Sequence, residues 1–116
     1  MKEKITILHN SRCSKSREAL NMICEMGEKP EIIDYLKDTP TAKELTKIIK
    51  MIGVKPESLV RKSENIYKEK YKGKTLTDSE WIQAMVDNPI LIERPIIIKG
   101  DEALIGRPPE SVKRFL

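Results

Sequence analysis

Aromatic residues and cysteines are both scarce in this chain of 116 residues, and each scarcity excludes some classes of function. Aromatic side chains make up 4% of the residues, so the sequence offers no platform on which nucleic-acid bases would stack. Two cysteines are too few for a disulfide framework and fit reduced thiols in the cytoplasm. No apolar run approaches the roughly 20 residues of a membrane span, and residues 1–4 lead straight into a predicted strand without a signal peptide. We therefore expect a cytoplasmic protein that contacts neither membrane nor nucleic acid.

Basic residues outnumber acidic ones, which gives the chain a formal net charge of +4. Most lysines and arginines are interleaved with acidic residues, and this is typical of a solvated surface rather than of a nucleic-acid footprint. The charge supports only a modest attraction for small anions. Hydrophobic residues at 39% and charged residues at 34% indicate a globular chain, and its length indicates a single domain.

The most informative stretch is a polar turn between a predicted strand and a predicted helix. Residues 4–8 form an apolar, β-branched run, and apolar residues recur at helical spacing from Ala19 to Gly27. Cys13 lies in the turn between them, at or next to the N-terminus of the helix. Unpaired N–H groups and the positive end of the helix dipole favour a thiolate there and bind oxyanions. The polar neighbours of Cys13 therefore predict a reactive thiol rather than a buried structural cysteine.

The second cysteine, Cys24, falls on the apolar stripe of this helix and is expected to pack in the core. About 16 Å of helix, at about 1.5 Å per residue, separates it from Cys13, whereas a disulfide needs Cα atoms within about 7 Å. Ser16 stands where a Cys-x-x-Cys motif would have its second thiol. A site with a single thiol depends on external thiols for turnover.

The remaining pattern completes an α/β fold. Residues 30–36 read as a second strand, so the chain begins with a βαβ unit whose strands are parallel. Capping boxes at Thr41 and Thr77 begin two helices, and the block from about 39 to 88 is predicted to be all helical.

A hairpin and a last helix follow this helical block. Residues 95–98 and 102–105 are predicted strands, and residues 108–116 are predicted helix. We therefore expect a single thioredoxin-like domain, with a four-stranded mixed sheet flanked by helices. Its core is expected at about 1–38 and 89–116, with a helical insertion at about 39–88.

Three arginines, Arg61, Arg94 and Arg107, stand out by their surroundings. Arg94 lies between two apolar segments, and Arg107 lies between Gly106 and a proline. A single arginine would be expected at the surface. The planar guanidinium matches tetrahedral oxyanions, and several of them can neutralise a doubly charged one. Together with Cys13, these arginines indicate an oxyanion site.

Over nearly its whole length, the sequence resembles the glutaredoxin-coupled arsenate reductase family of the thioredoxin superfamily. The matching stretches are residues 9–17, 59–62, 88–96 and 106–108. The resemblance implies that Cys13 is the nucleophile that attacks arsenate or a similar small oxyanion.

The resemblance also assigns roles to the residues around Cys13. His9 is expected to favour the Cys13 thiolate as a histidinium, and Pro95 to be the cis proline that faces the cysteine loop. Arg17 is expected to be a structural residue near the site. The oxyanion-binding triad is expected to be Arg61, Arg94 and Arg107.

The resemblance implies no metal and no bound cofactor. Glutathione is the expected co-substrate, which attacks the adduct of arsenate with Cys13. Glutaredoxin is the expected partner, which reduces the resulting mixed disulfide, and arsenite is released. The expected role is in arsenical resistance.

The chain departs from the usual loop of this family, Asn-Pro-x-Cys-Gly-Thr-Ser-Arg. Ser11 and Ser14 replace the proline and the glycine, a change expected to affect loop rigidity, while Arg12 and Lys15 add charge. Glu93, next to an arginine of the triad, is expected to compete with substrate by pairing with that arginine.

Two other functions remain open from the sequence. The first is a monothiol, glutaredoxin-like thiol–disulfide oxidoreductase without an oxyanion substrate. The second is a non-enzymatic redox regulator that binds RNA polymerase. Such regulators carry a Cys-x-x-Cys switch, and Ser16 argues against one here.

Overall fold

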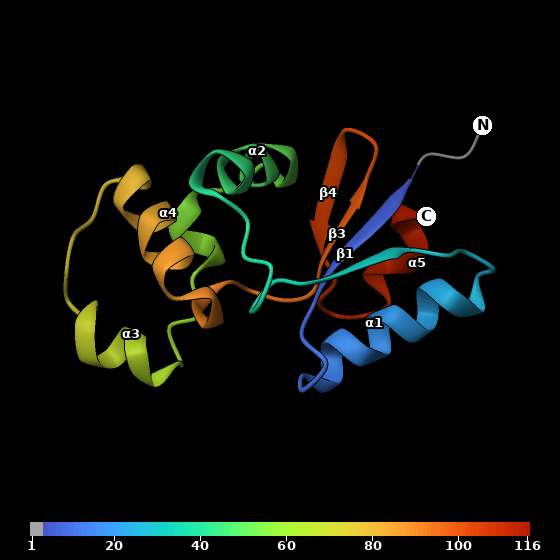
Figure 1. Ribbon diagram of the computed structural model, residues 1–116, viewed down its shortest axis with the longest axis horizontal. Helices are drawn as coiled ribbons and strands as arrows, with labels where there is room; N and C mark the ends of the chain where they lie inside the picture. The colour runs from blue at the N-terminus through green and yellow to red at the C-terminus, as the bar shows by residue number, and fades with distance from the viewer. Residues whose placement is uncertain (1–3) are drawn as a thin grey trace. The chain divides into compact units, whose positions relative to one another are not determined.

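The computed structural model describes residues 4–116, which divide into two compact units. One unit contains the described residues up to Asp38 together with Arg94–Leu116, and the other is Thr39–Glu93. All four strands belong to the first unit, and helices α2, α3 and α4 belong to the second (Figure 1). Within residues 4–116, none of the helices has the length and apolar character needed to cross a membrane.

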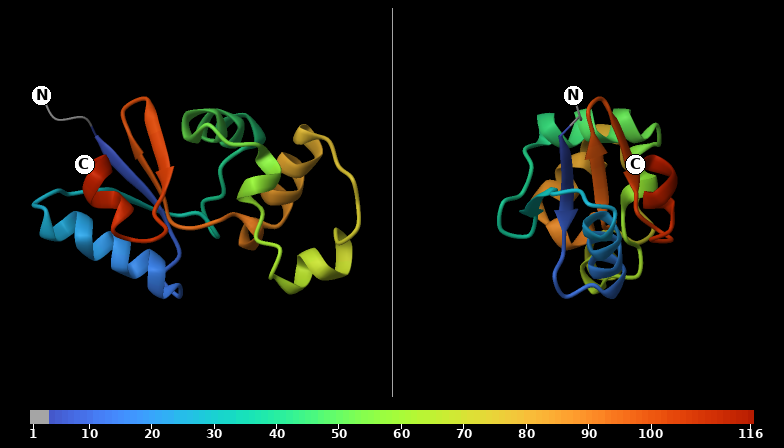
Figure 2. Two further views of the ribbon diagram at one scale, coloured as in Figure 1. Left: turned by 180° about the vertical axis from the view of Figure 1, so that it is seen from behind. Right: turned by 90° about the vertical axis from the view of Figure 1, so that its right-hand side faces the viewer.

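The first unit, here called the sheet unit, is a four-stranded mixed sheet, and it confirms the predicted fold class. Strand β1 pairs in parallel with β2 and antiparallel with β3, and β3 pairs antiparallel with β4. Helix α1 joins the parallel pair, as parallel strands require, whereas a tight turn at Gly100, with φ of 59°, joins β3 to β4. Figure 2 shows this hairpin beside β1. The bounds, in the spatial order of the strands, are β2 Glu31–Asp34, β1 Ile5–His9, β3 Ile96–Lys99 and β4 Glu102–Ile105.

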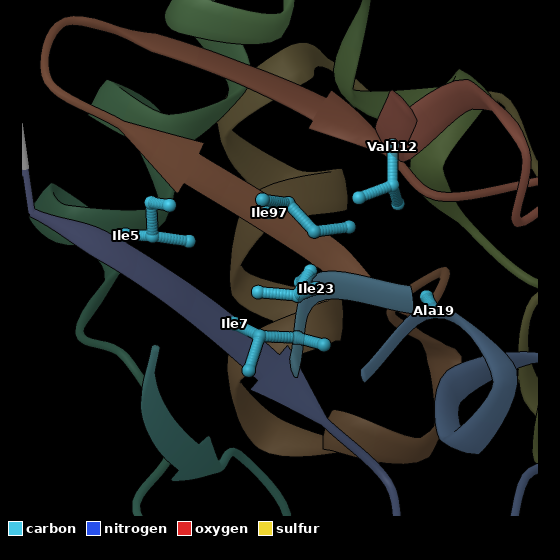
Figure 3. Close-up of a cluster of buried hydrophobic side chains, with 6 residues drawn as sticks. All are labelled: Ile5, Ile7, Ala19, Ile23, Ile97 and Val112. Atoms are coloured by element: carbon cyan, nitrogen blue, oxygen red, sulfur yellow. The ribbon is translucent and has the colours of Figure 1, made fainter. Parts of the chain in front are cut away.

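One face of this sheet is covered by α1, Ser14–Glu25, and α5, Ser111–Phe115. Ile5 and Ile7 point to the same face of β1 because side chains alternate along a strand. Figure 3 shows how side chains from both helices meet this face. The cluster consists of Ile5, Ile7, Ala19, Ile23, Ile97 and Val112.

The prediction that Cys24 packs in the core is wrong, because Cys24 is exposed. The buried stripe of α1 is narrow and runs through Ser16, Ala19 and Ile23. Cys24 follows Leu20 by one turn, and Leu20 is itself only partly buried at the margin of the cluster. The apolar face therefore ends before it reaches the second cysteine.

The last helix is shorter than predicted and begins at Ser111 rather than at Pro108. The N–H of Ser111 donates to the carbonyl of Pro108 at 2.9 Å, and the N–H of Val112 donates to Pro109 at 3.1 Å. These are three-residue spacings, so the two prolines form a tight turn that leads into the helix.

The second unit, here called the helical unit, begins its two longest helices with the predicted capping boxes. The N–H of Glu44 donates to Thr41 Oγ1 at 3.1 Å, and the N–H of Thr41 donates to Glu44 Oε1 at 3.0 Å. Thr77 and Glu80 repeat the arrangement. Two orphan N–H groups are thereby satisfied at each helix start. The elements are α2 Ala42–Ile52, the 3-10 turn η1 Pro56–Leu59, α3 Asn65–Lys70, α4 Asp78–Asp87 and the 3-10 turn η2 Pro89–Leu91.

Candidate active site

The strand register brings three separate segments to one edge of the sheet. Leu8, near the end of β1, pairs with Ile96 at the start of β3, and Ile96 pairs with Ile105 at the end of β4. The loop after β1, the residues before β3 and the residues after β4 therefore meet. Cys13, Arg94 and Arg107 lie in these three segments.

The loop between β1 and α1 is held by one buried hydroxyl. Ser16, fully buried in the first turn of α1, accepts a hydrogen bond from the N–H of Asn10 at 3.1 Å. Its Oγ also lies 2.7 Å from His9 Nδ1. The hydroxyl therefore ties the end of β1 to the start of the helix, and this fixes the position of Cys13 between them.

Further hydrogen bonds hold the loop that contains Ser11 and Arg12. The N–H of Arg12 donates to Asn10 Oδ1 at 2.9 Å, which closes an Asx turn. The N–H of Cys13 donates to the carbonyl of Asn10 at 3.0 Å. Arg17 Nη1 donates to the carbonyl of Ser11 at 2.8 Å. Ser14 is the first residue of α1, so this position of the loop has helical geometry.

The Cys13 sulfur is half-buried and lies among hydrogen-bond donors. Arg107 Nη2 donates to it at 3.2 Å. Burial opposes the charged thiolate. Hydrogen bonds from the Ser16 backbone, the Arg94 side chain and the Lys15 backbone, together with the charge of Arg107, outweigh that effect and lower the pKa of Cys13. The arrangement favours a thiolate with two guanidinium groups beside it.

The pKa of His9 argues against the expected histidinium. His9 is buried, and burial lowers the pKa of its ring below the ordinary value of 6.5. The carboxylate of Asp34 opposes this shift and the charge of Arg17 adds to it. The lowered pKa favours the neutral ring, and its bond to Ser16 suits His9 to positioning the cysteine loop rather than to placing a charge beside the thiolate.

Replacing His9 separates these two roles. We expect His9→Ala to raise the pKa of Cys13, because Ser16 loses its 2.7 Å partner and the N-terminus of α1 loosens. His9→Asn, whose amide lies near the position of Nδ1, is expected to keep most of the lowering. Iodoacetamide alkylation rates measured against pH give both values. If both variants raised the pKa equally, positioning by the hydrogen bond would be refuted.

Arg94 and Arg107 belong to neighbouring Arg-Pro segments that hydrogen-bond to each other. Arg107 Nε donates to the carbonyl of Arg94 at 2.6 Å, and the N–H of Gly106 donates to the carbonyl of Pro95 at 2.8 Å. The Arg94–Pro95 peptide bond is cis, as expected, and so is the bond between Arg107 and Pro108. The Arg107 side chain therefore contacts the backbone before β3 and the thiol at the same time.

Gly106 permits this close approach. A Cβ atom at this position would lie 2.7 Å from Ile97 Cδ1 and 3.0 Å from Pro95 Cγ, both closer than ordinary contact. Gly106→Ala is expected to destabilise the protein by about 1–3 kcal/mol, as overpacking of a core does, and to slow Cys13 alkylation by displacing Arg107. Urea unfolding measures the loss. Adding Ile97→Val, which removes Cδ1, should recover part of it; a double variant no more stable than Gly106→Ala would contradict this explanation.

Arg61 belongs to the helical unit, where two carboxylates hold its guanidinium. Its Nη1 donates to Glu93 Oε1 at 2.5 Å and its Nε to Glu64 Oε2 at 3.3 Å. Burial opposes the charge of Arg61, but these carboxylates outweigh it and raise the pKa of the guanidinium. Glu93 is the sequence neighbour of Arg94, and its carboxylate pairs with Arg61. A role of Arg61 in oxyanion binding stays a prediction.

Sequence reasoning missed the part that Ser16 plays. From the sequence alone, Ser16 stands out only as the replacement for a second thiol. A signal was present, because Ser16 lies three and seven residues before Ala19 and Ile23 on the buried stripe. A polar group on such a stripe needs a hydrogen-bond partner, and His9 was the nearby residue able to provide one.

Within residues 4–116, no three His, Cys, Asp or Glu side chains are grouped to hold a metal ion.

Comparison with known proteins finds relatives that match nearly the whole chain. The ArsC family profile matches residues 8–115. The uncharacterized protein YfgD of Escherichia coli K12 is 45% identical over 114 residues, which cover 97% of this chain and 96% of that protein. The arsenate reductase of Haemophilus influenzae is 39% identical over 114 residues, covering 97% of this chain and 98% of the relative.

A solved structure extends the similarity to three dimensions. The arsenate reductase from Vibrio cholerae superposes with a TM-score of 0.95 at 37% identity, and the match covers 100% of both chains. Sequence and fold therefore agree on the same group of relatives.

Proposed function

Because this chain belongs to the ArsC family, we propose that it is an arsenate reductase whose single nucleophile is Cys13. The observation that carries the proposal is the pair of guanidinium groups at one sulfur. Arg107 Nη2 lies 3.2 Å from Cys13 Sγ, and the Arg94 side chain hydrogen-bonds to the same atom. The groups that stabilise the thiolate are also suited to a tetrahedral oxyanion. Relatives named arsenate reductase support arsenate as that oxyanion.

The proposed reaction transfers two electrons from thiols to arsenic. The Cys13 thiolate attacks arsenate, and a sulfur–arsenic bond forms as a hydroxyl group leaves as water. A glutathione thiolate then attacks the adduct and forms a mixed disulfide, while the electron pair of the broken bond passes to arsenic. Arsenite leaves, and glutaredoxin reduces the mixed disulfide to restore the Cys13 thiol.

External thiols are proposed because the chain holds no second cysteine near the site. Ser16 replaces the thiol of a Cys-x-x-Cys pair, and its hydroxyl is already committed to His9 and Asn10. Cys24 lies on the exposed side of α1, in its last turn, whereas Cys13 caps the first turn. An internal disulfide therefore has no suitable partner for Cys13 among the described residues.

The proposal is tested by coupled NADPH oxidation. Purified protein is mixed with arsenate, glutathione, glutaredoxin and glutathione reductase, and the NADPH absorbance is followed. We expect oxidation that requires arsenate and is accelerated by glutaredoxin. Reduction of a small mixed disulfide without any response to arsenate would instead identify a monothiol oxidoreductase.

A further inference from the structure

The basic side chains in the loop and first helical turn around the nucleophile differ in their partners. Lys15 Nζ lies 3.6 Å from Glu18 Oε2, so its charge is compensated. Arg17 Nη1 donates to the carbonyl of Ser11 at 2.8 Å. Arg12 is exposed, and within residues 4–116 no side chain pairs with its guanidinium. Arg12 is therefore the uncompensated cation of this loop.

The backbone on both sides of this free cation is fixed. The N–H of Arg12 donates to Asn10 Oδ1 at 2.9 Å, and the N–H of Cys13 donates to the carbonyl of Asn10 at 3.0 Å. Adjacent Cα atoms are about 3.8 Å apart, so the Arg12 side chain starts from an ordered position next to the nucleophile. A cation that is held in this way loses less conformational freedom when it binds an anion.

The sulfur of Cys13 has two differently charged surroundings. Arg94 and Arg107, which hydrogen-bond to the sulfur, are the groups suited to the oxyanion. Cys13 is itself only half-buried, so an external thiol reaches it from the solvent, where the exposed Arg12 lies beside it in the chain. Glutathione carries two carboxylates and one ammonium group, and a guanidinium pairs well with a carboxylate.

Resting on the proposed function, we propose that Arg12 is a specificity-determining residue that selects the thiol donor by charge, through a carboxylate of glutathione. The guanidinium takes no part in the chemical step. It raises the local concentration of an anionic thiol or disulfide at the Cys13 sulfur relative to a neutral or cationic one.

Disulfide exchange measures this selection without arsenate. The Cys13 thiolate attacks one sulfur of a small disulfide, a mixed disulfide forms on Cys13, and the other half leaves as a thiolate that the solvent protonates. Cys24→Ser protein, in which Cys13 is the single thiol, is mixed with anionic glutathione disulfide, neutral 2-hydroxyethyl disulfide or cationic cystamine. Mass spectrometry follows the formation of each adduct.

The expected result is a change in preference rather than in overall reactivity. Arg12→Ala should lower the ratio of the glutathione disulfide rate to the 2-hydroxyethyl disulfide rate about two- to fivefold, the size of one exposed ion pair. The relative rate with cystamine should rise. These ratios cancel any change in the pKa of Cys13, because all three reagents meet the same thiolate. Added salt should weaken the preference of the native chain, because it screens exposed charges.

Four further variants separate charge from position. Arg12→Glu should lower the ratio about tenfold, because repulsion replaces attraction of similar size, and Arg12→Lys should keep most of it. Lys15→Ala should have a smaller effect than Arg12→Ala, because Glu18 already compensates that lysine. Lys29→Ala removes an exposed cation beyond the other end of α1 and should leave the ratio unchanged.

Arsenate turnover supplies the second measurement. Arg12→Ala should raise the KM for glutathione and leave the KM for arsenate unchanged. Equal slowing with all three disulfides, a loss of preference in Arg12→Lys as large as in Arg12→Ala, or a rise in arsenate KM alone would overturn the inference. A changed preference among the disulfides in a protein that does not reduce arsenate would support the selection by Arg12 and refute only the proposed reaction.

Discussion

Cys13→Ser is expected to reduce arsenate-dependent NADPH oxidation to the rate measured without protein. Serine at neutral pH is a poor nucleophile unless a base activates it. The groups around this position donate hydrogen bonds and positive charge rather than accept a proton. His9, the nearby ring with a lowered pKa, is bonded to Ser16 instead. The initial rate at saturating arsenate and glutathione measures the effect.

Cys24→Ser is the matched control for this experiment. Cys24 is an exposed free cysteine, so the exchange of sulfur for oxygen there disturbs no packing. We expect both the rate and the urea midpoint of this variant to match those of the wild type. If Cys24→Ser removed activity while Cys13→Ser kept it, the assignment of the nucleophile would be wrong.

Arg107→Ala is expected to lower kcat/KM about ten- to a hundredfold, because it removes a charge-assisted contact to a doubly charged oxyanion, worth about 1.5–3 kcal/mol. In the protein without substrate, Nη2 donates to the Cys13 sulfur at 3.2 Å and Nε donates to the Arg94 carbonyl at 2.6 Å, so the guanidinium is held beside the nucleophile. The pKa of Cys13 should rise at the same time, because a nearby positive charge is lost. Steady-state kinetics and the alkylation profile measure the two effects separately.

Two further variants help to interpret this result, Arg107→Lys as a partial rescue and Arg114→Ala as a control. Lysine keeps the charge but cannot donate to the sulfur and to the carbonyl in the same fixed geometry, so it should restore only part of the rate. Arg114 is an exposed arginine on α5, and its loss should have no effect on either measurement. A full rescue by lysine would show that charge alone matters and that the fork geometry does not.

The sequence was sufficient for the order of strands and helices because each element carries a local signal. The β-branched run before Cys13, the capping boxes at Thr41 and Thr77 and the turn at Gly100 each specify a structure within a few residues. Helix boundaries were less certain. The last helix began three residues late because the two prolines before it form their own turn.

The chemistry of the site was harder to predict, because it depends on which groups meet in space. Burial lowers the pKa of His9 and so disfavours the expected positive charge, and a sequence does not reveal how deeply the ring is buried. The prediction that Cys24 packs in the core failed because the spacing of apolar residues does not show how wide the buried face of a helix is. The pairing of Arg61 with Glu93 joins residues 32 positions apart, and neither residue type nor spacing predicts it.

The proposed single-cysteine mechanism is tested most directly by the mass of the protein after incubation with arsenate and glutathione in the absence of glutaredoxin. We expect glutathione to become attached to Cys13, at close to one equivalent, only when arsenate is present, and added glutaredoxin to remove it. Peptide mapping assigns the modified cysteine, with phosphate in place of arsenate as the control. Attachment that is independent of arsenate, or that occurs on Cys24, would refute Cys13 as the nucleophile that reacts with arsenate.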